Sequence, residues 1–323
     1  MHPIHAGPTG AVPTIRPMTF SVRRVVTQVD GDGAAFASDG PPPNMVSAPG
    51  FGVAELLWLD GPPTSVDDGG DRTTPGYPLE PPAGGLSSRI ITMPPNGEWL
   101  RVDGDDPDHP GMHATDTLDL MVVLDGEITL GLPDRELTVR AGEAVVQQGT
   151  AHRWKVSGDQ PCTYWVTMVR PGPGAAGDLS ILGGDSPVRR IVTGALVDDH
   201  APIGVQGAGV TLVDVWQTGG PVTAVDQGGD VPPPWGLEPA GGGVALRWFE
   251  MPVHEVGEEG WHTTATIDID VVLAGRVALE LPGSRVELAK GDVVVQRGTD
   301  HRWVPIGDEP MQMAALMIAV PVP

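Results

Sequence analysis

Residues 113–154 read HATDTLDLMVVLDGEITLGLPDRELTVRAGEAVVQQGTAHRW, and residues 262–303 read HTTATIDIDVVLAGRVALELPGSRVELAKGDVVVQRGTDHRW. The second stretch begins 149 residues after the first (262 − 113), the alignment needs no gap, and 20 of the 42 positions are identical. An ungapped match of this length indicates an internal duplication, which predicts two domains of the same fold.

The duplicated stretch has the pattern of a β-structure. Between residues 113 and 124 the side chains alternate with a period of two: the even-numbered residues from 118 to 124 are Leu or Val, and the opposite face carries His113 and Asp119. Asp125-Gly126 then predicts a tight turn, because glycine tolerates a positive φ. Further short strands are expected at 127–132, 136–139 and 144–147. Many short strands with regular turns predict an all-β sandwich or barrel.

Composition limits the classes of function. The chain has 323 residues and a formal charge of −23, so an acidic surface disfavours nucleic acid and membranes as partners. The expected partner is a small organic molecule, since a small β-barrel can enclose a pocket for one such ligand. The single cysteine, Cys162, lies among apolar residues and is expected to be a buried thiol rather than a nucleophile. No apolar run is long enough to span a bilayer, and the first twenty residues lack the apolar region of a signal peptide. Both observations predict a cytoplasmic protein. A monomer and a homodimer both fit.

The similarity extends beyond the central stretch to whole domains. Each half begins with two arginines and β-branched residues, RRVVT in the first and RRIVT in the second, and a Pro/Gly-rich segment separates the halves. The expected organisation is an N-terminal arm (1–20), a first domain (21–170), a linker (171–186) and a second domain (187–323).

These motifs resemble the cupin family. A His-containing strand pair around a glycine turn, followed by a Val-Val-Gln strand, a Gly-Thr turn and a closing His-Arg-Trp, is similar to the two cupin motifs, and both motifs occur in both halves. More narrowly, H-x-T-x(3)-D and VVQ-x-G-T-x-H-x-W resemble a subgroup of small bacterial and fungal cupins. The resemblance implies two tandem jelly-roll barrels, a bicupin, that pair within one chain as an intramolecular pseudo-dimer. It does not by itself imply one reaction, since the fold hosts many chemistries.

The resemblance also implies where a metal would bind. Cupins hold a divalent ion with a His-x-His pair, a Glu and a later His. In this sequence Thr replaces the second His, and Asp replaces Glu. The remaining candidate ligands are His113, Asp119 and His152 in the first half and His262, Asp268 and His301 in the second. Two His and one carboxylate suit Fe, Mn, Ni or Zn, with water completing the coordination.

A metal-free interpretation uses the same residues as acids and bases. All of these positions lie on the face opposite the Leu/Val stripe and should point into the barrel, where the histidines are the nearest expected partners of each carboxylate. Position 121 is Met in the first half, whereas its equivalent in the second half is Asp270, about 7 Å from Asp268 along the strand. The second barrel is therefore the favoured active site, with Asp268 and His301 as base and acid and His262 orienting them.

Three functions remain open from the sequence. The favoured one is a small-molecule enzyme, a cyclase, isomerase or lyase of secondary metabolism. The alternatives are a metal-dependent oxygenase and a non-catalytic ligand-binding protein. No nucleotide-binding glycine loop, catalytic Ser or Cys elbow or paired-cysteine zinc motif occurs in the sequence, which disfavours phosphoryl transfer and serine or cysteine hydrolysis.

Overall fold

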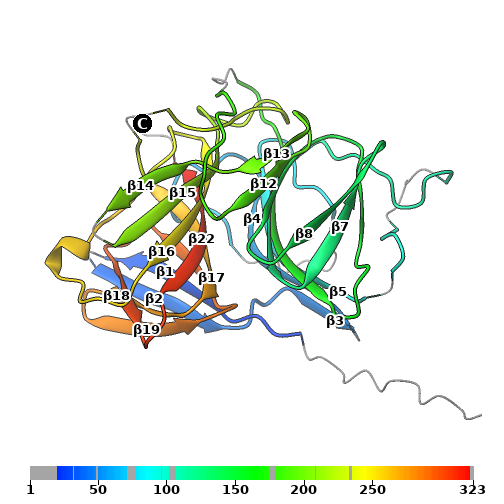
Figure 1. Ribbon diagram of the computed structural model, residues 1–323. Helices are drawn as coiled ribbons and strands as arrows, with labels where there is room; N and C mark the ends of the chain where they lie inside the picture. The colour runs from blue at the N-terminus through cyan, green and yellow to red at the C-terminus, as the bar shows by residue number, and fades with distance from the viewer. Residues whose placement is uncertain are drawn as a thin grey trace, which may run out of the picture.

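The structure is a computed structural model that describes residues 20–31, 33–48, 50–70, 78–95, 97–101, 107–174, 179–207, 209–232 and 235–320. The expected N-terminal arm, apart from its last residue, and residues 175–178 of the expected linker lie outside this part of the chain. The described residues form two barrels side by side (Figure 1). Within them, no helix has the length and apolarity needed to cross a membrane.

The first barrel combines an eight-stranded and a three-stranded sheet. The large sheet has the order β13-β12-β9-β6-β11-β5-β4-β3, and the small sheet has the order β10-β7-β8. The strands are β3 (Met45–Ala48), β4 (Phe51–Leu59), β5 (Leu86–Met93), β6 (Leu118–Asp125), β7 (Glu127–Gly131), β8 (Glu136–Arg140), β9 (Ala144–Gln148), β10 (Arg153–Lys155), β11 (Cys162–Val169), β12 (Arg189–Val192) and β13 (Val197–His200).

The second barrel repeats this plan. Its large sheet has the order β14-β15-β16-β22-β17-β20-β1-β2, and its small sheet has the order β19-β18-β21. The strands are β1 (Arg24–Asp30), β2 (Gly33–Gly40), β14 (Ile203–Gly207), β15 (Val210–Gln217), β16 (Val244–Met251), β17 (Thr266–Ala274), β18 (Arg276–Leu281), β19 (Ser284–Ala289), β20 (Val293–Arg297), β21 (Arg302–Ile306) and β22 (Met311–Ala319). Among the described residues, the 3₁₀ turn η1 (Glu258–Gly260) is the single helical element. The fold is thus all-β, with two tandem cupin-type barrels in one chain.

The short strands expected from the sequence are confirmed as β7, β8 and β9, with ends that differ by at most one residue. The first expected strand is shorter than its alternation suggested. It begins at Leu118 as β6, and His113 forms an isolated bridge with His152. The predicted turn is confirmed by Gly126, whose φ is 75° and where a Cβ would come within 2.5 Å of the Pro161 carbonyl oxygen.

The two halves exchange their first strands. β1 pairs in parallel with β20 of the second half, and β12 pairs in parallel with β9 of the first half. β2 and β13 extend the respective sheets as antiparallel neighbours. The expected domains, 21–170 and 187–323, are thus divisions of the sequence. In space, each large sheet contains strands from both of them.

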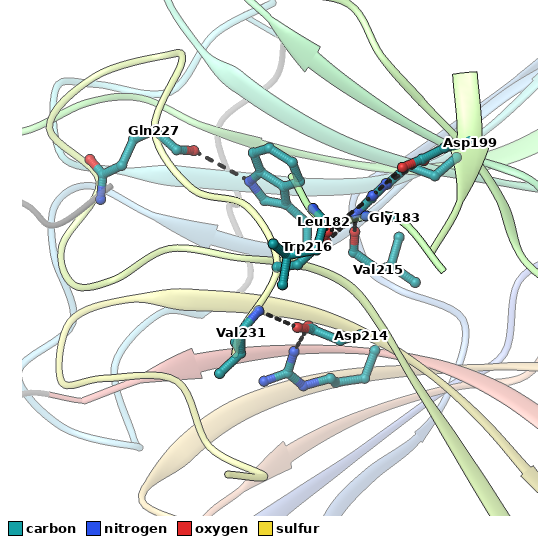
Figure 2. Close-up of polar contacts among 11 residues, drawn as sticks. Leu182, Gly183, Asp199, Asp214, Val215, Trp216, Gln227 and Val231 are labelled. Carbon is teal, nitrogen blue, oxygen red and sulfur yellow. Dashed lines mark hydrogen bonds and ion pairs between the residues drawn. The ribbon is translucent and has the colours of Figure 1, made fainter. Parts of the chain in front are cut away.

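Arg190, a buried arginine on β12, holds this strand against the second barrel. Figure 2 shows two of the residues that it contacts, Asp199 and Val215. Arg190 donates to both carboxylate oxygens of Asp199 on β13, at 3.0 and 2.7 Å, and to the Val215 carbonyl oxygen of β15, at 2.9 Å. It also pairs with Asp230, whose side chain is fully buried. β12 belongs to the large sheet of the first barrel, whereas Val215 lies on β15 of the second barrel. The guanidinium of Arg190 therefore links the two barrels.

Three hydrophobic cores support this arrangement. The largest takes residues from both halves, including Leu118 and Leu120 of β6 and Ile267 and Ile269 of β17, so it joins the two barrels. Each barrel interior has a smaller core of its own. The Leu/Val face of the repeated strand thus packs against the other half, and its opposite face, including Asp119, turns into the barrel as predicted.

Candidate functional site

The second barrel contains a cavity of about 390 Å³. Its walls come from β15, β16, β17, β21 and β22, and the segment before β17 forms its mouth. Most of the lining is apolar and includes Leu212, Phe249, Met251, Trp303, Met311, Met313 and Met317. The polar lining includes His254, Glu259, His262, Thr264, Asp268, Asp270 and His301. The interior therefore has space for one small organic molecule.

Asp268 and Asp270 occupy the inward face of β17. Each is only 5% exposed, and both line the cavity because residues two apart on a strand point to the same side. On the neighbouring strands, Asp268 lies opposite Gln296 and Met317, and Asp270 lies opposite Val294 and Ala315. The cross-strand neighbours of both carboxyl groups are therefore uncharged.

Burial changes the protonation of both aspartates. Oδ2 of Asp268 accepts a hydrogen bond of 3.2 Å from the Thr264 hydroxyl, while Oδ1 has no hydrogen-bond partner in the part of the chain that the structure describes. Burial raises the pKa of Asp268 to about 7. The pKa of Asp270 is raised well above its ordinary value, first by burial and then by the negative charge of Asp268. Near neutral pH the pair therefore carries at least one proton.

His301 lies deeper than its partner histidine. It is 2% exposed, and the amide nitrogen of Gln296 lies 2.5 Å from its Nδ1 and 2.9 Å from the Thr299 carbonyl oxygen. The Thr299 carbonyl oxygen also lies 2.9 Å from Nδ1, so this ring nitrogen accepts from the Gln296 amide in one tautomer and donates to Thr299 in the other. Burial, assisted by His262, lowers the pKa of His301 to about 4, so the ring is neutral at pH 7.

His262 lies nearer to the solvent than His301. Its side chain is exposed at the mouth of the cavity, and Nδ1 lies 3.0 Å from the Gly260 carbonyl oxygen. Its ring centroid is 4.3 Å from that of His301. His262 lines the cavity from the segment that precedes β17, and its outer side is open to solvent.

The carboxylates and histidines do not form the expected pairs. Asp268 bonds to the Thr264 hydroxyl and His301 bonds to Gln296, and no ion pair links a histidine to these aspartates among the described residues. Likewise, the described ranges contain no group of three or more His, Cys, Asp or Glu side chains that could hold a metal ion. His262, Asp268 and His301 thus do not form such a group in the described part of the chain.

The first barrel has the same polar residues around less space. Its cavity measures about 130 Å³ and is lined by His113, Asp119 and His152, with Met121 in place of a second carboxylate. Burial raises the pKa of Asp119 to about 7, and burial with His113 lowers the pKa of His152 to about 4. As in the second barrel, these three side chains belong to no metal-binding group within the described residues.

The sequence interpretation missed some lining residues. The Thr264 hydroxyl contacts Asp268. His254 and Glu259 also line the cavity. The spacing of Met311, Met313 and Met317, alternate residues of one strand, was a signal for a methionine wall. Cys162 is fully buried and its pKa is raised to about 12 by burial, which confirms an inert thiol.

One solved structure shares the two-barrel fold over nearly the whole chain. A putative glyoxylate induced protein from Pseudomonas aeruginosa matches 98% of this chain and 97% of its own, with a TM-score of 0.51 and 11% sequence identity. No family model matches the sequence.

Sequence relatives come from fungal biosynthesis clusters. Phomopsin biosynthesis cluster protein C' from Diaporthe leptostromiformis is 36% identical over 136 residues, which are 41% of this chain and 59% of that protein. Oryzines biosynthesis cluster protein J from Aspergillus oryzae is 44% identical over 63 residues, 19% of this chain and 34% of that protein. The alignments thus span between one third and three fifths of these relatives.

Proposed function

We propose that this protein is an enzyme that converts a small organic molecule by proton transfer inside the second barrel, in a cyclisation, isomerisation or elimination. One observation carries this proposal: two buried aspartates, Asp268 and Asp270, share the wall of an open and otherwise largely apolar cavity. Paired carboxyl groups in such a site can hold one proton and one charge near neutral pH, which supplies both an acid and a base.

The proposed roles follow from protonation. Asp268, with a pKa of about 7, takes a proton from the substrate, and Asp270, whose pKa is raised by burial and by Asp268, returns one at another atom. His301 is neutral and lines the same cavity, where its ring can form a hydrogen bond with a polar atom of the substrate. These roles differ from the sequence prediction, in which His301 was the acid and His262 oriented the pair, because Gln296 occupies Nδ1 and His262 lies at the mouth.

The biological setting is proposed from the relatives. Since proteins of the phomopsin and oryzines biosynthesis clusters share sequence with this chain, we assign the reaction to a tailoring step of secondary metabolism. The apolar walls favour an intermediate with a hydrophobic body. A cytoplasmic location and a monomeric or homodimeric state remain predictions of the sequence.

Turnover of a metabolite extract in deuterated water tests the proposal. The wild-type protein and the Asp268→Asn variant are incubated with extract of the source organism, and products are followed by mass spectrometry. We expect a product that carries solvent deuterium, and a rate at least about 100-fold lower for the variant. Binding without any conversion would instead indicate a ligand-binding protein, and conversion that stops when a chelator is added would indicate a metal-dependent oxygenase.

A further inference from the structure

The second cavity is lined by acidic side chains and by no lysine or arginine of the described residues. Its lining includes Asp268 and Asp270 in the interior and Glu259 at the mouth. The neighbouring arginines are already engaged: Arg247 with Asp214 and Gln217, and Arg302 with Glu280. A bound anion would therefore contact no lysine or arginine in this part of the wall.

Unsatisfied acceptors point to the same conclusion. Oδ1 of Asp268 and Oε1 of Gln296 are buried, and neither has a hydrogen-bond partner in the described part of the chain. The two residues are cross-strand neighbours on β17 and β20, so their side chains lie on one face of the sheet. Buried acceptors without donors are rare in folded proteins. Asp268 lines the cavity, so a ligand with N–H groups would supply a donor to its Oδ1. The same two acceptors of the first barrel, on Asp119 and Gln147, also have no partner in the described part of the chain, but Met121 stands there in place of the second carboxyl group.

We propose that the second barrel binds an organic molecule with a hydrophobic body and a protonated amine, and that the amine lies between Asp268 and Asp270. An ammonium group has three donors and one positive charge, which match the two carboxyl groups that line the cavity. The carboxyl-bearing residues are separated by two positions, about 7 Å along the strand, a span that one ammonium group can bridge. The methionine and aromatic walls would contact the rest of the molecule.

The inference rests on the proposed function only in the choice of the second barrel, and its test requires no turnover. Three probes of similar shape and different charge are titrated calorimetrically in the presence of EDTA: phenethylamine, 2-phenylethanol and 3-phenylpropionate. The proteins are the wild type, Asp268→Asn, Asp270→Asn and, as the matched control in the first barrel, Asp119→Asn. Circular dichroism establishes that each variant is folded.

We expect phenethylamine to bind at least about tenfold more tightly than the alcohol at pH 8, and 3-phenylpropionate to bind least. Either substitution in the second barrel should remove most of this preference, and Asp119→Asn should preserve it. Equal affinity for the amine and the alcohol, tighter binding of the carboxylate, an unchanged preference in both second-barrel variants, or no binding by any probe would overturn the inference.

The outcomes also separate this inference from the proposed function. Amine-selective binding by a protein that converts no metabolite supports the inference and contradicts the proposed enzyme. Conversion of a metabolite by a protein without amine selectivity supports the enzyme and contradicts the inference.

Discussion

The two barrels keep the same polar residues but enclose different spaces. Each has an aspartate on the inward face of a strand and a glutamine that contacts a buried histidine. A second histidine lies beside the buried one, with about 4.4 Å between the two ring centroids. The cavity nevertheless measures about 130 Å³ in the first barrel and about 390 Å³ in the second. The shared residues thus belong to the architecture of both barrels, and the residues that differ decide which barrel admits a ligand.

Sheet register identifies those differences. On β11, Tyr164 and Val166 line the first cavity, and Met313 and Ala315 occupy the equivalent places on β22. Val166 faces Met121, whereas Ala315 faces Asp270. A smaller side chain on one strand therefore opens space in front of the additional carboxyl group on the next. This comparison can be tested at four places, from the largest expected effect to the smallest.

The largest effect is expected where the barrels are tied together. Arg190→Met leaves Asp199 and Asp230 without their cation, so we expect the free energy of unfolding to fall by about 3–5 kcal/mol in urea denaturation. The control is Arg189→Met, since its pairs with Asp198 and Glu143 are partly exposed and are worth about 1 kcal/mol or less. Similar losses in both variants would show that burial of Arg190 adds nothing.

The second effect concerns Asp119, whose burial should make the first barrel sensitive to pH. Its folded pKa of about 7 exceeds the ordinary 3.8, so the folded state binds a proton that the unfolded state releases, and stability falls as the pH rises from about 4 to 7. Asp119→Asn removes this penalty and should stabilise the protein by up to ~4 kcal/mol at pH 8 and by almost nothing at pH 4.

Thermal unfolding at the two pH values measures this difference. The contribution of His152 has the opposite sign, because its lowered pKa adds stability as the pH rises from about 4 to 6.5, and it is present in both proteins. A destabilised Asp119→Asn protein at pH 8 would mean that the ionised carboxylate has a partner in the fold.

The third effect sharpens the comparison of cavity size. Ala315→Val gives the second barrel the residue of the first, and we expect ligand affinity to fall about tenfold, equivalent to about 1.4 kcal/mol, as the added methyl groups fill the space before Asp270. Calorimetric titration with phenethylamine measures it, and an exposed change, Asp300→Asn, serves as control. Unchanged affinity would place the ligand elsewhere in the cavity.

The smallest effect is expected from the glutamines. Gln296→Leu removes the donor that fixes the His301 ring, and turnover should fall about fivefold because the ring then adopts more than one orientation. Gln147→Leu makes the same change at His152 and should leave turnover unaltered. Equal losses from the two substitutions would mean that both barrels contribute to the reaction.

Much of the fold follows from local sequence patterns. The repeat predicted two like barrels, the alternation around Asp119 predicted which side chains turn inward, and Gly126 marked a turn that needs a positive φ. The exchange of β1 and β12 was not predicted as a strand pairing. Such pairing joins residues that are far apart in sequence, for example Arg24 with Val293, and depends on how the two halves meet.

The site was predicted in its residues but not in its contacts. Asp268, Asp270 and His301 do share one cavity, as the strand period required. Their hydrogen bonds depend on the depth and rotamer of each side chain, which the alternation does not determine, so the expected pairing of histidine with aspartate was wrong and Thr264 and Gln296 take those places. The size of the cavity could not be predicted either, because it depends on residues such as Ala315 and Asp270, which come together only when β17 and β22 pair.

The most direct test of the central claim replaces Asp270, the second carboxyl group on the inward face of β17, where the first barrel has Met121. The second-order rate constant kcat/KM on the identified substrate is measured for Asp270→Met, which gives the second barrel the residue of the first, and for Asp119→Asn in the first barrel. The account predicts a loss of at least about 100-fold for Asp270→Met and a change within about twofold for Asp119→Asn. A larger loss in Asp119→Asn than in Asp270→Met would contradict it and assign the reaction to the first barrel.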